Sequence, residues 1–273
     1  MPFYTRLIAG ALLAFAGSAL AAPASHVRIG VVDSPQNAAI ELAAQRAAEQ
    51  GIEVEVVTFS DWNTPNLALN NGDIDVNYFQ HQAFLENARA QNNYDLIPIG
   101  YGVQNRIALY SSRITSFGEV KDGDSVGVAD DPVNQGRGLH LFQQAGLLKL
   151  RPDAGPKAGL PDIIDNPRHL KFIELPGPQL ARVLDDVTIA QATPSHMLAA
   201  GKDPNNALLF SNVDESGLLY ALRFVVTSKN VKNPAILQFI HIFQTDPQVL
   251  AAIEKAYGNP QLYSLAWRQE AAR

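Results

Sequence analysis

The sequence predicts an α/β fold built on mostly parallel sheets, because short apolar runs alternate with helical segments along nearly the whole chain. Residues 27–32 form the first such run, and Ser34-Pro35 is typical of the start of a helix. The helical segment keeps apolar residues at helical spacing until Gly51, and residues 54–59 then predict a second strand. Together these segments form one strand–helix–strand unit, the repeating element of a parallel sheet.

The alternation falls into two sets, which predicts two lobes. The first set continues with two strands and a helix between them, at residues 74–78, 96–99 and 80–91. The second set contains four predicted strands, at residues 107–110, 126–129, 170–175 and 188–190. Asn233-Pro234 and Asp246-Pro247 each start an amphipathic helix, and we expect these two helices to pack back on the first lobe.

Residues 1–21 have the composition of a cleaved secretory signal peptide. Arg6 ends a short first region, residues 7–17 are apolar, and Ala19-Leu20-Ala21 offers the small residues of a cleavage site. The apolar run is shorter than the roughly 20 residues that a permanent membrane helix needs. We therefore expect cleavage after Ala21 and a periplasmic mature protein.

Net charge, cysteine content and histidine spacing exclude several classes of partner and bound group. Loss of the signal peptide removes Arg6 and no acidic residue, so the net charge changes from −6 to −7, which argues against nucleic acid as a partner. The chain has no cysteine, and we expect neither disulfides nor a lipid anchor on an N-terminal cysteine. The histidines show no metal-ligand spacing, and we expect neither a metal nor a cofactor.

Residues 126–150 carry the most informative local pattern. A predicted strand runs into a helix at Asp131-Pro132, where aspartate is a capping residue and proline takes the first helical position. Such a junction presents backbone N–H groups and the positive end of the helix dipole, and Arg137 adds a guanidinium that pairs with a carboxylate. The stretch therefore predicts an anion-binding site. The alternative is a surface Arg137 in a salt bridge to Asp130 or Asp131.

Five segments carry a resemblance that spans nearly the whole mature chain. They are VTFSDWNTPN (57–66), GDIDVNYFQHQAFL (72–85), VADDPVNQGRGLHLFQQAGLLKL (128–150), DNPRHLKFIELPGPQLARVLDD (165–186) and, more loosely, FVVTSKN (224–230). In these segments the chain resembles the methionine-binding lipoprotein family, the substrate-binding components of methionine ABC importers.

The resemblance implies a type II periplasmic-binding-protein fold, in which two α/β lobes joined by two crossover strands close over a ligand. In this chain the crossovers are expected near residues 105–109 and 222–226. After the signal peptide, the expected organisation is a first lobe, a second lobe and a C-terminal return to the first lobe, at residues 22–106, 107–222 and 223–273.

The resemblance also implies roles for single residues. Arg137 matches the family arginine that holds the ligand carboxylate, and Asn134 is a polar neighbour on the same turn. Phe79 and His81 match a segment that gives the pocket an aromatic wall and a polar contact, and Trp62 stands where the family usually has a tyrosine. The alternatives are that Phe79 belongs to the sheet core, that His81 only caps the following helix, and that Trp62 is a packed surface indole.

Several positions depart from the family pattern. At the first crossover, the family's Phe-Val-Tyr-Pro segment is replaced by a segment that includes Asn105 and Arg106. Thr193 and Arg223 stand where methionine binders carry asparagines that orient the amino acid's polar head. These exchanges weaken the case for an ammonium group and favour an amine-free or more acidic ligand. Alternatively, both arginines project into solvent and the ligand is methionine.

The function expected from the resemblance is that of a monomeric substrate-binding protein, which delivers a small amino-acid-like or related organic-acid ligand to an ABC permease and its ATPase. One alternative is a bilobed periplasmic enzyme that acts on a small carboxylic acid, with His81 as the candidate acid or base. The other is a sensor subunit that presents its ligand to a membrane receptor. Fold alone does not separate these functions.

Overall fold

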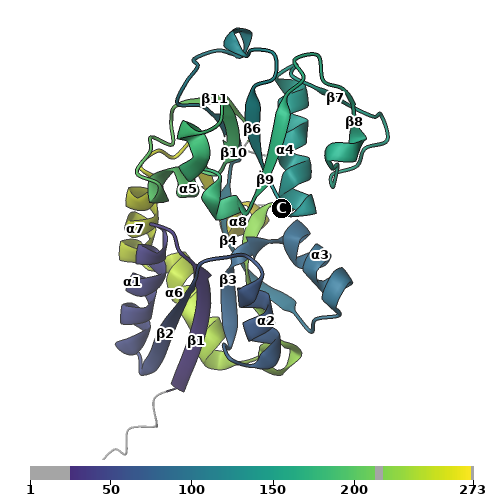
Figure 1. Cartoon of the computed structure of the whole chain (residues 1–273). Coiled ribbons are helices and arrows are strands. Elements are labelled where there is room, and N and C mark those ends of the chain that lie inside the picture. Colours follow the sequence, from purple (N-terminus) through teal and green to yellow (C-terminus); the bar gives the residue numbers. More distant parts are fainter. Residues whose placement is uncertain (1–24, 213–217, 272–273) are drawn as a thin grey trace, which may run out of the picture.

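The computed structural model describes residues 25–212 and 218–271, and it shows two lobes, each built around its own sheet (Figure 1). The expected signal peptide lies outside the described residues. No helix in the described ranges is both long and apolar enough to cross a membrane.

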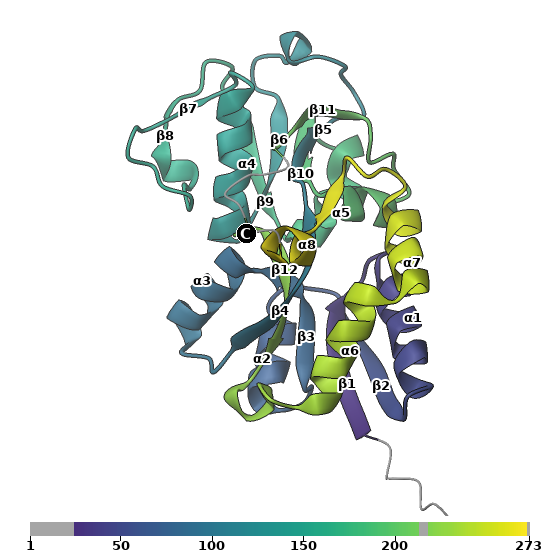
Figure 2. The same cartoon turned by 180° about the vertical axis from the view of Figure 1, so that it is seen from behind.

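The first lobe contains a six-stranded sheet in the order β13-β4-β12-β3-β1-β2. Its strands are β1 (Ser25–Val32), β2 (Ile52–Phe59), β3 (Val76–His81), β4 (Ile97–Asn105), β12 (Ala221–Val226) and β13 (Tyr263–Leu265). Its helices are α1 (Asn37–Ala48), α2 (Thr64–Asn71), α3 (Gln82–Asn92), α6 (Pro234–Thr245), α7 (Pro247–Tyr257) and α8 (Ala266–Ala271). Helices α6 and α7 pack beside α1, which confirms the expected return of the C-terminal helices (Figure 2).

Both faces of this sheet are buried. Phe224 and Val226 belong to the core beneath α1, α6 and α7, whereas Val225 belongs to the smaller core beneath α2. Successive residues of a strand point to opposite faces, so residues 224–226 of β12 are apolar without alternation, and the strand lies between β4 and β3 inside the sheet.

The second lobe contains a five-stranded sheet in the order β11-β5-β10-β6-β9. Its strands are β5 (Ala108–Tyr110), β6 (Ser125–Ala129), β9 (Lys171–Leu175), β10 (Ile189–Ala192) and β11 (Ala207–Phe210). Its helices are α4 (Pro132–Gln144) and α5 (Pro194–Ala199), and a small hairpin pairs β7 (Lys149–Leu150) with β8 (Ile163–Asp165). Short 3₁₀ helices of this lobe occur at Phe117–Glu119, Leu160–Asp162, Gly177–Gln179 and Arg182–Asp185, and one at Ser228–Asn230 follows β12 in the first lobe.

The chain passes between the lobes twice. Strand β4 ends in the first sheet at Asn105 and β5 begins in the second sheet at Ala108. The chain returns between β11, which ends at Phe210, and β12, which begins at Ala221. The fold is therefore the expected two-lobed one, and the strand order supports the expected crossovers. The lobe boundaries after residues 106 and 222 stay predictions.

The expectation of mostly parallel sheets is wrong in detail. Strand β1 is parallel to β2 and β3, and β6 is parallel to β9 and β10. Strand β12, however, is antiparallel to β3 and β4, β13 is antiparallel to β4, and β5 is antiparallel to β10 and β11. Most of these antiparallel strands adjoin a crossover, where the chain enters a sheet from the other lobe. Apolar patterning locates such strands but does not encode their direction.

Helix starts were predictable where the capping residue precedes proline. The Asn233 side chain accepts from the N–H groups of Ala235 and Ile236, and the Asp246 side chain caps α7 in the same way. Helix α1 differs, because it begins at Asn37 after Gln36 rather than at Ser34-Pro35. The Ser34 hydroxyl instead accepts from the Gln36 N–H (3.3 Å) in the turn before the helix.

Candidate functional site

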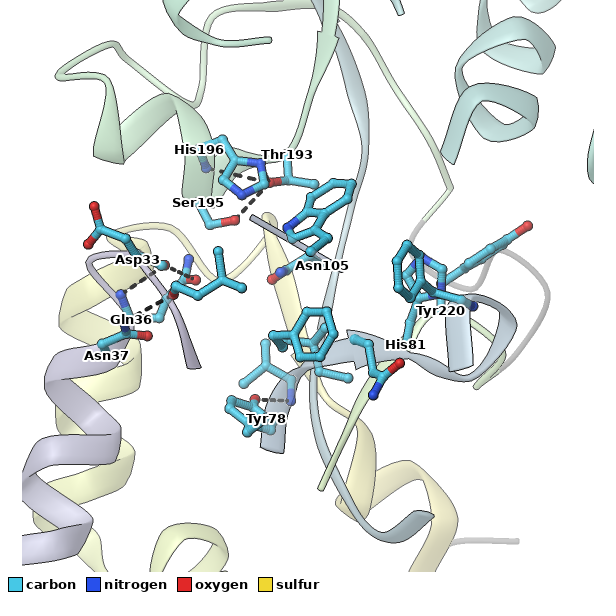
Figure 3. A pocket seen from close by; sticks show the side chains of 18 of the residues that line it. Asp33, Gln36, Asn37, Tyr78, His81, Asn105, Thr193, Ser195, His196 and Tyr220 are labelled. Carbon is cyan, nitrogen blue, oxygen red and sulfur yellow. Dashed lines mark hydrogen bonds between the residues drawn. The ribbon is translucent and has the colours of Figure 1, made fainter. Parts of the chain in front are cut away.

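A pocket lies between the two lobes and takes its lining from both (Figure 3). The first lobe contributes residues at the ends of β1, β3 and β4 and the loop that carries Trp62, and the second contributes α4 and the start of α5. Ligands of open α/β sheets bind at the carboxyl ends of strands, and β1 and β3 both end at this pocket.

Helix α4 starts as predicted, but its terminus is already occupied. The Asp131 carboxylate accepts from the backbone N–H of Asn134 (2.9 Å) and from its side-chain Nδ2 (3.2 and 3.0 Å). Burial raises the pKa of Asp131, because the charged carboxylate loses hydration. The expectation that this helix terminus holds the ligand's acidic group is therefore corrected, since the chain's own carboxylate takes that place.

Arg137 lies one turn further along α4 and lines the pocket with 5% of its surface exposed. Its guanidinium carbon lies 3.9 Å from the centre of the Tyr220 ring. Two glycines flank it: a Cβ at Gly138 would lie 1.6 Å from Gln191 Oε1, and one at Gly136 would lie 2.2 Å from the Pro156 carbonyl oxygen. The missing side chains let α4 pack directly on its neighbours, which fixes the position of Arg137.

His81 joins the two lobes. Its Nδ1 accepts from the N–H of Phe84 (3.1 Å) as the cap of α3, so the ring proton belongs on Nε2, which donates to Asn134 Oδ1 (3.1 Å). Burial, and then the nearby charge of Arg137, lower the pKa of His81 to about 3. The ring is neutral at pH 7. His81 therefore caps its helix and lines the pocket at the same time.

Aromatic rings form another part of the lining. Phe79 and Trp62 both line the pocket, and each packs edge-on against Phe84, with ring centres 6.0 and 6.2 Å apart. Trp62 also lies 5.6 Å from the His196 ring of the second lobe. These contacts enclose an apolar volume beside Arg137 and His81.

Thr193 and Asn105 also line the pocket. Thr193 caps α5, and its hydroxyl lies 2.7 Å from the Ser195 hydroxyl and 3.1 Å from His196 Nδ1. Asn105 Oδ1 accepts a hydrogen bond from the hydroxyl of Tyr257. Both polar groups thus border the pocket while being held by partners in the chain.

Arg106 and Arg223 do not line this pocket, which corrects the expectation that they border it. Arg106 Nε donates to the Ser211 carbonyl (2.7 Å), and its guanidinium lies 4.6 Å from the centre of the Phe210 ring. Arg223 Nε donates to Gln82 Oε1 (3.0 Å), and its guanidinium lies over Tyr101. Sequence position alone places both arginines near a crossover, but the side chains turn to other partners.

Known proteins are similar to this chain in sequence and in overall structure. The D-methionine-binding lipoprotein MetQ of Salmonella typhimurium is 37% identical over 236 residues, which cover 85% of this chain and 86% of that protein. A nutrient-binding protein from Burkholderia cenocepacia, solved bound to methionine, is 31% identical with a TM-score of 0.81, over 88% of this chain and 100% of that one. The substrate-binding protein of a methionine transporter from Streptococcus pneumoniae is 28% identical with a TM-score of 0.82, over 89% and 96%.

Residues 27–264 match the NlpA lipoprotein family. The chain belongs to this family. Its solved relatives include substrate-binding proteins of transporters, and this chain shares their two-lobed architecture.

Several pocket residues of this NlpA lipoprotein family member escaped the sequence analysis. They are Gln36, Asn37, Ser195, His196 and Tyr220 (Figure 3). Gln36 and Asn37 stand where the loop after β1 enters α1, so the rule that ligands meet the carboxyl ends of strands pointed to this segment. Tyr220 lies just before β12, and no local pattern distinguishes it from an ordinary loop tyrosine.

Proposed function

We propose that this protein is the periplasmic substrate-binding protein of an ABC importer, and that it binds one small amino-acid-like ligand between its lobes. The observation that carries the proposal is the place of Arg137, buried in the second lobe yet lining a pocket that the first lobe completes. A guanidinium offers two parallel N–H donors, which match the two oxygens of a carboxylate. Relatives that carry the name of a methionine binder or were solved with methionine support this choice of ligand.

The charges of the pocket favour an amino acid over a more acidic ligand. Arg137 and Asp33 are the charged side chains in the lining of this described pocket, apart from two histidines that burial keeps neutral. Such a balance suits a ligand with one acidic and one basic group. The more acidic ligand rested on Arg106 and Arg223, and their guanidinium groups face other partners.

Transport requires the lobes to respond to the ligand. A ligand favours the closed state only through contacts with both lobes, and here Arg137 and the Trp62 loop lie on opposite lobes. The closed form would then present one surface made from both lobes to the permease and its ATPase. We further propose that the signal peptide is cleaved after Ala21, that the mature protein carries no lipid anchor and that it is a monomer.

Calorimetric titration with L- and D-methionine and with 4-(methylthio)butanoate, which lacks the amine, tests the ligand class. We expect methionine to bind and the amine-free acid to bind more weakly. Arg137→Lys keeps the positive charge but loses the two parallel N–H donors of the guanidinium. We expect the affinity for methionine to fall by about 10- to 100-fold. Equal binding by Arg137→Gln would refute the carboxylate contact.

The same samples distinguish transport from catalysis. Mass spectrometry of methionine recovered after incubation with the protein would show it unchanged if the protein only binds it. A converted product that disappears in a His81→Asn variant would favour the enzyme, because His81 is the candidate acid or base.

A further inference from the structure

Trp62 of the first lobe rests on the backbone of Gly177 in the second. Trp62 lies in the loop between β2 and α2, and Gly177 begins the 3₁₀ helix that follows β9. A Cβ on Gly177 would lie 1.9, 2.2 and 2.6 Å from three carbon atoms of the indole's six-membered ring. Separations below 3.0 Å do not occur at real Cβ atoms, so no other amino acid fits here without movement.

The indole is held from the first-lobe side. Asp61 Oδ1 accepts from the N–H groups of Asn63 (2.7 Å) and Thr64 (2.8 Å), and its Oδ2 accepts from the Thr64 hydroxyl (2.6 Å). These bonds fix the turn on both sides of Trp62. The ring also packs against Phe84 of its own lobe. A clash at Gly177 is therefore transmitted to the separation of the lobes rather than absorbed by the loop.

We propose that Gly177 is a positioning residue for ligand binding: its missing side chain lets Trp62 reach the second lobe and complete closure of the cleft. The inference rests on the proposed function and adds to it a determinant of closure. Trp62 lines the pocket whereas Gly177 does not, so Gly177 acts through the indole. Closure at this edge depends on a large ring in one lobe meeting bare backbone in the other.

A substitution at Gly177 affects ligand affinity by changing how much of the protein is in the closed, binding-competent state. When the binding-competent state is only fractionally populated, the apparent dissociation constant rises by the inverse of that fraction. The backbone of Gly177 does not adopt a positive φ, so alanine suits its conformation, and the three nearest atoms that a Cβ would meet all belong to Trp62. A loss of affinity in Gly177→Ala would therefore report the contact rather than backbone strain.

The test compares Gly177→Ala with Gly155→Ala, a glycine of the same lobe that also lacks a positive φ and has nothing within 4 Å of the position of a Cβ. For methionine, we expect the first variant to bind about 10-fold or more weakly and the control to bind like wild type. Trp62→Phe shortens the ring, so the double variant Trp62→Phe/Gly177→Ala should recover affinity relative to Gly177→Ala alone. Equal affinity of Gly177→Ala and Gly155→Ala, or no recovery in the double variant, would overturn the proposal.

A second measurement needs no ligand. The sequence contains two tryptophans, so a Trp267→Phe background leaves Trp62 as the sole indole emitter. Adding Gly177→Ala to this background should shift the emission to longer wavelength as the ring becomes exposed, and adding Gly155→Ala should not. If wild type binds no methionine, the proposed function fails, while this comparison still supports or refutes the contact.

Discussion

The Nε2 of His81 donates to the side-chain oxygen of Asn134 over 3.1 Å, and this hydrogen bond connects the two lobes across the pocket. Asn134 also bonds within the second lobe, because its Nδ2 donates to both oxygens of Asp131. The N–H of Phe84, the imidazole, the amide and the carboxylate thus form one chain of bonds with a single consistent direction. Because His81 accepts at Nδ1 and donates at Nε2, this chain of bonds is the one that a neutral imidazole makes.

The neutral imidazole makes stability depend on pH. The pKa of His81 falls from 6.5 to about 3 on folding, so between these values the unfolded chain binds a proton that the folded chain does not. Stability contributed by His81 is therefore complete above pH 6.5 and is lost as the pH falls toward 3, with a slope of about 1.4 kcal/mol per pH unit for one proton. Urea unfolding at pH 7, 6 and 5 measures this slope.

The His81→Asn variant isolates the contribution of this ring. Asparagine is also a good helix cap but does not titrate. In the variant, the pH dependence of the free energy of unfolding should therefore decrease by the contribution of one proton. His196 contributes a similar dependence, because burial lowers its pKa to about 4, and its slope should persist in the variant. An unchanged slope would show that His81 does not remain neutral in the fold.

Removing the middle of the chain of bonds should affect both folding and binding. Asn134→Ala leaves the half-buried Asp131 with two fewer hydrogen bonds, and we expect the free energy of unfolding to drop by about 1–3 kcal/mol. Affinity for methionine should also fall, because the contact that joins the lobes through His81 is lost. Urea unfolding and calorimetry measure the two effects, with the exposed Asn92→Ala as the control.

Gly138 should be intolerant of even a methyl group. Its Cβ would meet Gln191 Oε1 at 1.6 Å, so Gly138→Ala must displace either that side chain or α4. We expect a destabilisation of about 1–3 kcal/mol together with weaker ligand binding, because Arg137 is the preceding residue. Thermal unfolding checks the first effect. A variant that binds methionine as tightly as wild type would show that Arg137 does not depend on this packing.

Arg223 should be dispensable for binding. Its guanidinium faces Gln82 and Tyr101 outside the pocket lining, so Arg223→Gln should keep its affinity for methionine within about 3-fold of wild type. Arg137→Lys is the contrasting variant in the same titration. A specific loss of binding to amine-free acids in Arg223→Gln would instead restore the hypothesis of a more acidic ligand.

Local patterns predicted the parts of this fold that local interactions determine. Caps followed by proline located α4, α6 and α7, and apolar runs located most of the strands. Strand direction was not predictable, because it depends on which lobe the chain arrives from. The strand β13 was also missed, since its three residues carry no pattern longer than that of a loop.

In the candidate site, too, local patterns predicted some features, whereas contacts between distant residues determine others. Arg137 stood out because a capped helix start precedes it, whereas the role of its flanking glycines becomes visible only beside Gln191 and Pro156. For His81, capping and pocket lining are not alternatives, because each ring nitrogen performs one role. The pairing of Trp62 with Gly177 joins residues more than a hundred positions apart, and no single-sequence signal reports it.

Arg106 lies outside the pocket lining, and its contacts have a mechanical consequence. Its Nε holds the carbonyl of Ser211, while the next residue, Ile107, exchanges hydrogen bonds with the same serine, N–H to Oγ (3.2 Å) and carbonyl to N–H (2.8 Å). The two passages of the chain between the lobes are thereby braced to each other at one point. We expect opening to be a rotation about this pivot rather than a sliding of one lobe past the other, so its travel is smallest here and grows with distance from the brace.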